Sequence, residues 1–548
     1  GQYSTAVIGG FASWPLRRSA RSAGSLLKLA LFIGILTGLA WFNSGPAQAA
    51  GEEFPPICAD VTAISPEECG ALVTLYEATG GGDWSDNTNW LQIGDGITPC
   101  DWHGVGCQDG HVRSLNLAQN GLVGRLPSTV GQLGFLESLD LSGNRLGPRL
   151  AAGICDLGDT VESADFGYNL LEVRAAATRA CLDALDPDWR ETQTISPFNL
   201  ELTGFGPGSI ELTWSPILYH DDGGFYEISN STSFSGDYVV HGTVADRSLT
   251  GYTLDGLEPG TSYFVRVRSV TPAHANHPET VSSDPTWAIG VTAGEGRILL
   301  AVHISADNNL SSYVPSILRR IRRGTDINPN LTALVLADRR GENNTQLFRS
   351  QDGEMTAVEI LEDVWGGTEL DMADPAVLTW FLRYARESVQ PDRMIVSLVG
   401  HGVGPTPDLA WVPETPPEEP PASPVDGIPP LPRGLEFTPA DVTDGSYLST
   451  PDLARALIDA TDNGANPFDI LFFDQCFQGN LDVLYEVRNV AEHFVASPNY
   501  AWLVAPYAQY ISQMAPAADN AAIAEAIIKS RPKPRPKGPA GPYIEAQW

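Results

Sequence analysis

The chain of 548 residues is 43% hydrophobic and 18% charged, and its 67 Asp and Glu against 33 Lys and Arg give a formal net charge of −34. This composition excludes a disordered or fibrous chain, and at roughly 100–200 residues per domain the length predicts about three or four domains. Nucleic acid is not an expected partner, because phosphate binding needs a basic face that this acidic balance does not supply.

Residues 1–49 have the organisation of an export signal. Four basic and no acidic residues precede a 14-residue apolar run at 29–42, and Ala47-Gln48-Ala49 gives the small-x-small pattern of a cleavage site. As a helix the run spans only about 21 Å, less than a hydrocarbon core of roughly 30 Å. We expect a signal peptide at 1–49 and a secreted or cell-surface protein without a stable membrane span after cleavage. A retained anchor is the alternative.

Residues 55–190 contain a repeat with a period of 24 to 25 residues. The positions Leu115, Leu117, Asn120, Leu122 and Leu126 recur as Leu139, Leu141, Asn144, Leu146 and Leu150, and in part as Ala164, Phe166, Asn169 and Leu171. This pattern is typical of leucine-rich repeats, in which short strands bury the leucines and the Asn satisfies backbone groups at the turn. It predicts a short α/β solenoid. Either its concave face binds a protein or glycan ligand, or the domain is a folded spacer.

The cysteines of this region flank the repeats. The segment PCDWHGVGC at 99–107, with the residues before it, resembles the N-terminal cap of plant-type leucine-rich repeats. On this resemblance we expect three short-range disulfides, which suit an oxidising compartment. They join Cys58 to Cys69, Cys100 to Cys107 and Cys155 to Cys181.

Residues 192–293 show short runs that alternate between apolar and polar side chains, which predicts a β-sandwich. The segment LEPGTSY at 257–263 resembles the tyrosine corner of fibronectin type III modules, and Trp214 stands where their core Trp does. Such modules are mostly spacers, and we assign this one no site.

Residues 296–530 change to parallel α/β. Near-continuous apolar runs at 298–304, 332–336, 394–399 and 468–473 predict strands buried on both faces, with helical segments between them. Functional groups in such sheets gather at the carboxyl ends of the strands. His401 follows one such run between glycines, and Cys476 follows another. Cys476 is also the one cysteine left after the three disulfides are drawn, which makes it a candidate nucleophile.

The segment 296–530 resembles the clostripain family of cysteine peptidases, which has a caspase-like α/β fold. The matching motifs are ADNNL at 306–310, SLVGHGVG at 397–404, LSTPDL at 448–453 and FDQCFQGNLD at 473–482. The resemblance implies His401 as general base and acid, Cys476 as nucleophile, and the backbone amides of Gly402 and Cys476 as oxyanion donors. It also implies Asp474 in the substrate pocket, hence protein or peptide substrates with Arg or Lys before the cleaved bond. The alternative for Asp474 is capping of the following helix.

A long segment rich in Pro and Glu, 405–446, separates His401 from Cys476. Arg433 is its only basic residue, and we expect a peptidase of Arg specificity to cut itself there.

The Pro- and Lys-rich end, 531–548, does not fit the domain before it, and we expect an aberrant or truncated segment there. No cofactor is required by the sequence and no metal ligand set is visible in it, although the family resemblance implies that Ca²⁺ can be needed. The alternative function is a surface adhesion or protein-binding protein with a degenerate, inactive peptidase domain.

Overall fold

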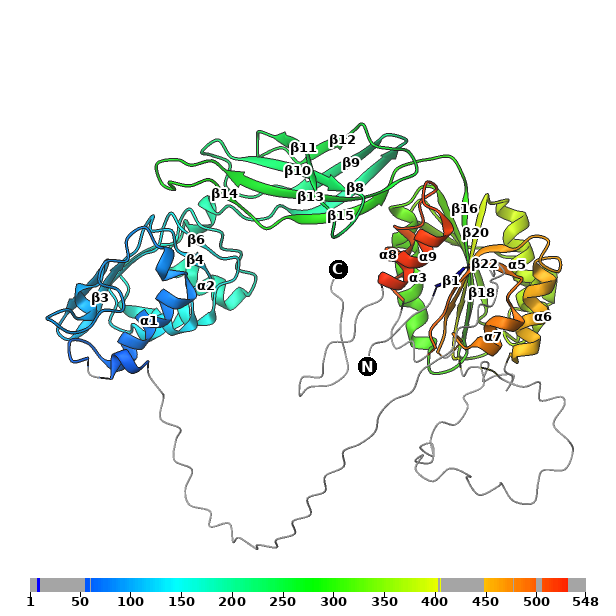
Figure 1. Ribbon diagram of the computed structural model, residues 1–548, viewed down its shortest axis with the longest axis horizontal. Coiled ribbons are helices and arrows are strands. Elements are labelled where there is room, and N and C mark those ends of the chain that lie inside the picture. The colour runs from blue at the N-terminus through cyan, green and yellow to red at the C-terminus, as the bar shows by residue number, and fades with distance from the viewer. Residues whose placement is uncertain are drawn as a thin grey trace, which may run out of the picture.

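The computed structural model describes residues 7–9, 55–59, 61–402, 405, 448–476, 478–498 and 505–530. It contains a repeat domain, a β-sandwich and an α/β domain in chain order, with the sandwich between the other two (Figure 1). Of the predicted signal peptide, only the backbone of 7–9 is described. Arg433, nearly all of the segment 405–446 and the end 531–548 lie outside the described residues. Among the residues that are described, no helix has the length and apolar character needed to cross a membrane.

The repeat domain opens with helix α1 (Pro66–Ala78), which Ser65 and Glu68 cap reciprocally. Strand β2 (Val105–Gln108) then pairs antiparallel with β3 (His111–Asn116). Strands β3, β5 (Ser138–Asp140) and β7 (Ser163–Asp165) are parallel, as are the short pair β4 (Val123–Gly124) and β6 (Arg145–Leu146). Helix α2 (Ala176–Leu185) follows. The 3₁₀ turns are η1 (Pro56–Cys58), η2 (Gly81–Asp83), η3 (Pro99–Asp101), η4 (Ser128–Gln132), η5 (Ala152–Thr160) and η6 (Trp189–Thr192).

A ladder of buried amides holds successive repeats together. The Oδ1 atom of Asn144 accepts hydrogen bonds from the backbone N–H groups of Asn120 and Leu122, both at 3.0 Å. Asn169 accepts in the same way from the backbone of the preceding repeat. After the last repeat Gln193 takes this role, with its Oε1 atom 2.9 Å from the backbone N of Leu171. The repeat thus satisfies backbone groups that burial would otherwise leave unpaired.

The three predicted disulfides are present in the repeat domain, Cys58–Cys69, Cys100–Cys107 and Cys155–Cys181. They close segments with sequence separations of 11, 7 and 26 residues at the two ends of the repeat array. Cys476 is not disulfide-bonded.

The β-sandwich has two antiparallel sheets, with strand orders β12-β9-β8 and β11-β10-β13-β14, and β15 also pairs with β13. Its strands are β8 (Phe198–Gly206), β9 (Ser209–Ser215), β10 (Phe225–Ser231), β11 (Val239–Val244), β12 (Gly251–Leu254), β13 (Ser262–Thr271), β14 (Val281–Ser282) and β15 (Thr286–Val291). The hydroxyl of Tyr263 accepts a hydrogen bond from the backbone N of Glu258 at 3.0 Å, which is the expected tyrosine corner. Trp214 is buried against Tyr226 in the core.

The α/β domain is built on an eight-stranded sheet in the order β1-β22-β21-β20-β16-β17-β18-β19. The five central strands are parallel: β16 (Ile298–Ala306), β17 (Leu331–Arg339), β20 (Arg393–Val399), β21 (Phe468–Asp474) and β22 (Ala491–Val495). Antiparallel strands complete the edges, β18 (Gln346–Gln351) and β19 (Glu354–Ala357) on one side and β1 (Val7–Gly9) on the other.

Helices cover both faces of this sheet (Figure 1). On one face lie α3 (Val314–Asp326), preceded by η7 (Ser311–Tyr313), with α8 (Tyr507–Ile511) and α9 (Asn520–Lys529). On the other lie α4 (Leu361–Trp365), α5 (Pro375–Val389), α6 (Thr450–Ala460) and α7 (Leu481–Glu486). All nine residues of β16 are buried, as the continuous apolar runs predict for a sheet covered on both sides.

The sandwich contacts the α/β domain at the amino ends of its parallel strands. Asn330, just before β17, accepts a hydrogen bond from the backbone N of Gly294 at 2.8 Å and donates to the carbonyl of Thr292. Ser262 of β13 donates to the carbonyl of Ser512 at 2.7 Å. The carboxyl ends of the same strands therefore face away from the sandwich.

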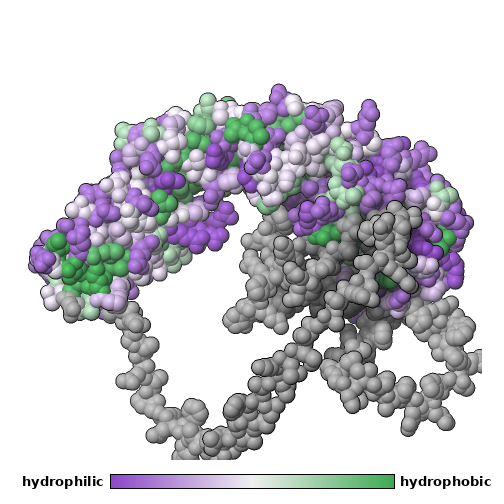
Figure 2. All heavy atoms as spheres, in the orientation of Figure 1, coloured by the Kyte–Doolittle hydropathy of each residue, from purple (hydrophilic) through white to green (hydrophobic). Residues whose placement is uncertain are grey.

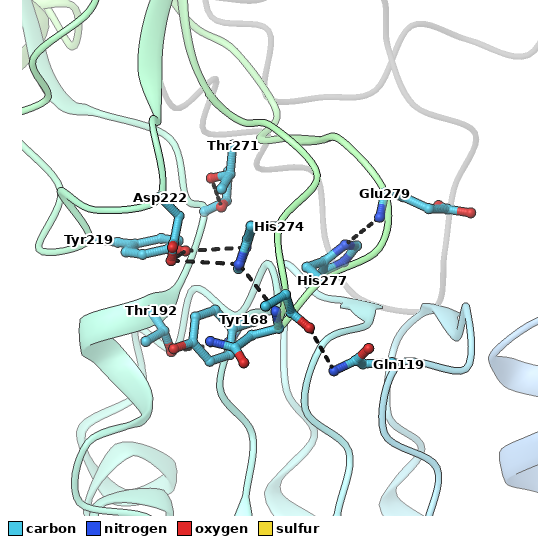
Figure 3. Close-up of polar contacts among 12 residues, drawn as sticks. Gln119, Tyr168, Thr192, Tyr219, Asp222, Thr271, His274, His277 and Glu279 are labelled. Atoms are coloured by element: carbon cyan, nitrogen blue, oxygen red, sulfur yellow. Dashed lines mark hydrogen bonds and ion pairs between the residues drawn. The ribbon is translucent and has the colours of Figure 1, made fainter.

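A loop of the sandwich also contacts the repeat domain. It carries His274 and His277, which lie beside Tyr168 and Gln119 of the repeats (Figure 3). His277 is buried, and its Nε2 atom lies 3.0 Å from the carbonyl O of Asn144. In the view of Figure 2 the surface is largely hydrophilic, with a hydrophobic patch at the end of the repeat domain farthest from the sandwich.

Candidate active site

The carboxyl ends of β20 and β21 bring His401 and Cys476 together. The two strands are parallel neighbours, and their register places Val399 opposite Asp474. His401 and Cys476 each follow these residues by two positions, so they stand at the same level beyond the sheet. Cys476 is partly exposed. The register therefore places both residues just beyond the carboxyl ends of two neighbouring strands.

Gly402 lies with its backbone directly against that of Cys476. A Cβ atom at Gly402 would overlap the carbonyl oxygen of Cys476 and would stand 2.9 Å from its backbone N. Real side chains do not occupy such a space, so the position needs glycine for close approach of two backbones. The two expected oxyanion donors thus belong to segments in direct contact.

The His401 imidazole is half-buried, and this burial lowers its pKa below the ordinary value for histidine. Its Nε2 atom lies 2.6 Å from Oδ1 of Asn309, which follows β16. A neutral imidazole can accept a proton near neutral pH. The contact with Asn309 orients the His401 ring, so the ring nitrogen that accepts the proton has a defined direction. The site therefore has the parts of a thiol and base pair.

Comparison with known families identifies all three regions. The model of the clostripain family matches residues 302–417 and 429–537. The fibronectin type III model matches residues 196–284, and a leucine-rich repeat model matches residues 135–157. The α/β domain is the part of the chain that matches the clostripain family. This similarity supports a cysteine peptidase.

Three known proteins show how far the similarity extends. A secreted C11 cysteine protease of Bacteroides thetaiotaomicron, solved with an irreversible peptide inhibitor, is 22% identical, with a TM-score of 0.32 over 43% of this chain and 58% of that one. An inactive zymogen C11 protease of Parabacteroides distasonis is 20% identical, with a TM-score of 0.27 over 40% and 53%. A leucine-rich repeat receptor-like serine/threonine-protein kinase of Arabidopsis thaliana is 35% identical over 72 residues, which are 13% of this chain and 6% of that protein. The chain spans less than two thirds of the length of each.

Asp474 ends β21 in the α/β domain, on the face covered by α8. The hydroxyl of Tyr507 lies 3.5 Å from its Oδ2 atom and also 2.7 Å from the hydroxyl of Ser397. The next described helix, α7, starts at Leu481 with Asn480 as its N-cap residue. Asp474 stands six residues before that cap, so it is not the N-cap residue of α7.

Two features of the site were not predicted from the sequence. The contact between Asn309 and His401 joins two loops, and only the ADNNL motif pointed to the first of them. Tyr507 beside Asp474 comes from α8 and has no motif of its own. Among the described residues, no group of three or more His, Cys, Asp or Glu side chains is arranged to hold a metal.

Proposed function

We propose that the protein is a secreted cysteine endopeptidase that hydrolyses peptide bonds after Arg or Lys. The observation that carries the proposal is the common level of His401 and Cys476 beyond two neighbouring parallel strands, with Gly402 against the Cys476 backbone. Ligands of open α/β sheets bind at this edge. The clostripain-family match supports the same chemistry.

The reaction runs through a thioester. His401 accepts the proton of the Cys476 thiol, and the sulfur attacks the carbonyl carbon of the scissile peptide. The carbonyl oxygen becomes an oxyanion that the backbone N–H groups of Gly402 and Cys476 stabilise. As the tetrahedral intermediate collapses, the C–N bond breaks and His401 returns the proton to the leaving amine. His401 then takes a proton from water as the water oxygen attacks the thioester carbonyl. The C–S bond breaks, and His401 returns the proton to the sulfur, which releases the carboxylic acid and regenerates the thiol.

Asp474 is the proposed determinant of substrate choice. A carboxylate that precedes the nucleophile by two residues can accept the two parallel N–H groups of an Arg guanidinium, or the ammonium of Lys. Contact with the Tyr507 hydroxyl supports a fixed position for this carboxylate. A substrate with Asp or Glu at the same position would place two like charges together and would be rejected.

We assign the repeat domain and the sandwich to one arm that tethers or spaces the peptidase. The equivalent repeat positions Gln119, Gly143 and Tyr168 all lie against the sandwich loop with His274. This edge of the repeats is thus occupied by the next module, which supports the spacer interpretation over a protein or glycan ligand there. The three disulfides support an oxidising, extracytoplasmic location.

The protein is expected to cleave itself after Arg433, because that residue combines the proposed specificity with a long Pro-rich segment. Mass spectrometry of the purified wild type should show a cut at this bond, and Cys476→Ala should stay intact. Equal cleavage in both would assign the cut to another protease.

Hydrolysis of fluorogenic peptides ending in Arg, Lys or Asp tests the proposal directly. The wild type should hydrolyse the Arg and Lys peptides and leave the Asp peptide intact, and Cys476→Ala should hydrolyse none. Asp474→Asn keeps the shape of the side chain but removes its charge, and should lower kcat/KM for the Arg peptide about 10- to 100-fold. No turnover of any peptide by the wild type would favour an adhesion protein with an inactive peptidase domain.

A further inference from the structure

No step of the proposed thioester reaction uses the ADNNL motif at 306–310. It follows β16, which lies between β17 and β20 at the centre of the sheet. The register of β16 with β20 places Ile304 opposite Val399. The loop after β16 therefore starts beside the segment that carries His401.

Two buried side chains shape this loop. Asp307 is 1% exposed and accepts a hydrogen bond at its Oδ1 atom from the backbone N of Gly341, at 3.3 Å. Asn308 is 2% exposed, and its Oδ1 atom accepts from the backbone N of Leu310 at 2.9 Å. Its amide also donates to the carbonyl of Ser305 at 3.4 Å. These bonds, one to Gly341 after β17 and two within the loop, hold the backbone that precedes and follows Asn309, while Asn309 itself is exposed.

We propose that Asn309 is a positioning residue, which holds the His401 ring through its Nε2 atom and leaves Nδ1 to exchange a proton with Cys476. The contact that supports this is the 2.6 Å separation of Asn309 Oδ1 and His401 Nε2. An amide oxygen only accepts, so with this amide orientation the neutral His401 ring carries its proton on Nε2 and its lone pair on Nδ1. The inference rests on the proposed peptidase function and adds a third member to the thiol and base pair.

The choice of amide rather than carboxylate has a chemical consequence. A carboxylate at this position would favour the imidazolium and raise the pKa of His401. A neutral amide orients the ring without raising the pKa of His401, so the lowering of this pKa by burial remains. The opposite orientation of the amide, with its N–H donating to Nε2, would put the proton on Nδ1 and leave no base for the thiol.

The test compares Asn309→Ala and Asn309→Asp with a matched control, Asn466→Ala. Asn466 is an exposed Asn before β21, at the opposite end of the sheet, and its side chain bonds only to Asp462 in the described contacts. Asn309→Ala should lower kcat for an Arg peptide about 10- to 100-fold with KM within about twofold, as part of the roughly 10²- to 10⁴-fold that general acid–base catalysis contributes. Asn309→Asp should recover most of this loss and move the acid limb of the kcat/KM profile to higher pH. Asn466→Ala should behave as the wild type.

A second measurement needs no peptide turnover. Alkylation of Cys476 by iodoacetamide across pH, followed by mass spectrometry, reports whether His401 acts on the thiol, with His401→Ala as reference. Asn309→Ala should shift the wild-type profile towards that of His401→Ala. An unchanged profile and unchanged kcat in Asn309→Ala would overturn the inference while leaving the peptidase proposal intact. If the wild type instead matches His401→Ala and hydrolyses nothing, the peptidase proposal itself fails. Equal losses in both Asn309 variants with an unchanged alkylation profile would assign Asn309 a purely structural role and overturn the inference as well.

Discussion

Gly402 and Cys476 come from different strand ends, yet the backbone of one lies so close to that of the other that no side chain fits between them. Gly402→Ala should push the Cys476 backbone out of place and disturb both oxyanion donors. Removal of a single donor of this kind costs about 10²- to 10³-fold in kcat. We expect at least a 100-fold fall in kcat/KM for an Arg peptide.

Gly367 gives the matched control for this variant, because a Cβ atom there meets nothing within 4 Å. Gly367→Ala should hydrolyse the Arg peptide at the wild-type rate. Thermal unfolding of both variants separates a local effect from loss of the fold. Wild-type activity in Gly402→Ala would contradict the assigned role of its backbone.

The pH dependence of hydrolysis follows from the burial of His401. The base must be neutral to accept the thiol proton, and burial lowers its pKa below the ordinary value of 6.5. A lowered pKa keeps the ring neutral to a lower pH, so the acid limb of kcat/KM should have its midpoint below 6.5. Initial rates at low substrate concentration between pH 4 and 8 measure it. A midpoint above 6.5 would mean that a negative charge, rather than burial, dominates around the ring.

The sequence predicts the contacts that a repeat or strand pairing sets, and it does not predict contacts between two loops. Asn144 and Asn169 were predicted because a repeat of period 24 to 25 places the same residue at the same turn, whereas Gln193 completes the ladder with a different residue and breaks the pattern. His401 and Cys476 were predicted because parallel strands present their carboxyl ends on one edge. The contact of Asn309 with His401 was not, since no periodicity governs how two loops meet.

We expect His303 to make the α/β domain sensitive to acid. It is fully buried in β16, its Nε2 atom has no hydrogen-bond partner among the described residues, and burial lowers its pKa to about 4 from 6.5. Because the folded state binds the proton more weakly than the unfolded state, stability is complete above pH 6.5 and falls as the pH drops towards 4. The linked loss approaches about 3 kcal/mol.

The variant His303→Phe removes this titrating group and puts a phenyl ring in its place. The ring of Phe381 is its neighbour, since the centroids of the His303 and Phe381 rings are 6.2 Å apart. Urea unfolding at pH 7 and pH 4.5 should show a smaller acid-induced loss of stability in the variant than in the wild type. An equal loss in both proteins would place the acid sensitivity in other groups.

Asn144 should be the most costly residue of the repeat ladder to remove. It is fully buried and bonds five backbone groups, those of Asn120, Leu122, Leu117, Leu141 and Ser142. Asn144→Ala leaves these groups buried without that partner, at roughly 1–3 kcal/mol for each group that finds no other partner. We expect a loss of about 3 kcal/mol or more in urea unfolding.

The exposed Asn116, whose side chain accepts only a local bond from the Ala118 backbone N in the described contacts, is the control for that variant. Asn116→Ala should cost less than about 1 kcal/mol. Similar losses for the two variants would show that the ladder bonds add little beyond the turn itself.

The joint between the repeat domain and the sandwich can be tested with two glycines of similar backbone conformation. Gly143 has φ +66°, and a Cβ atom there would overlap the carbonyl oxygen of Asn276 in the sandwich loop. Gly110 has φ +80°, and a Cβ atom there meets nothing within 4 Å. Alanine at either position carries the same left-handed backbone cost of about 1 kcal/mol, so their difference isolates the contact between modules. Small-angle X-ray scattering of the whole protein should show a larger radius of gyration for Gly143→Ala than for Gly110→Ala. Identical scattering curves would mean that the loop with His277 holds the modules together without the close approach at Gly143.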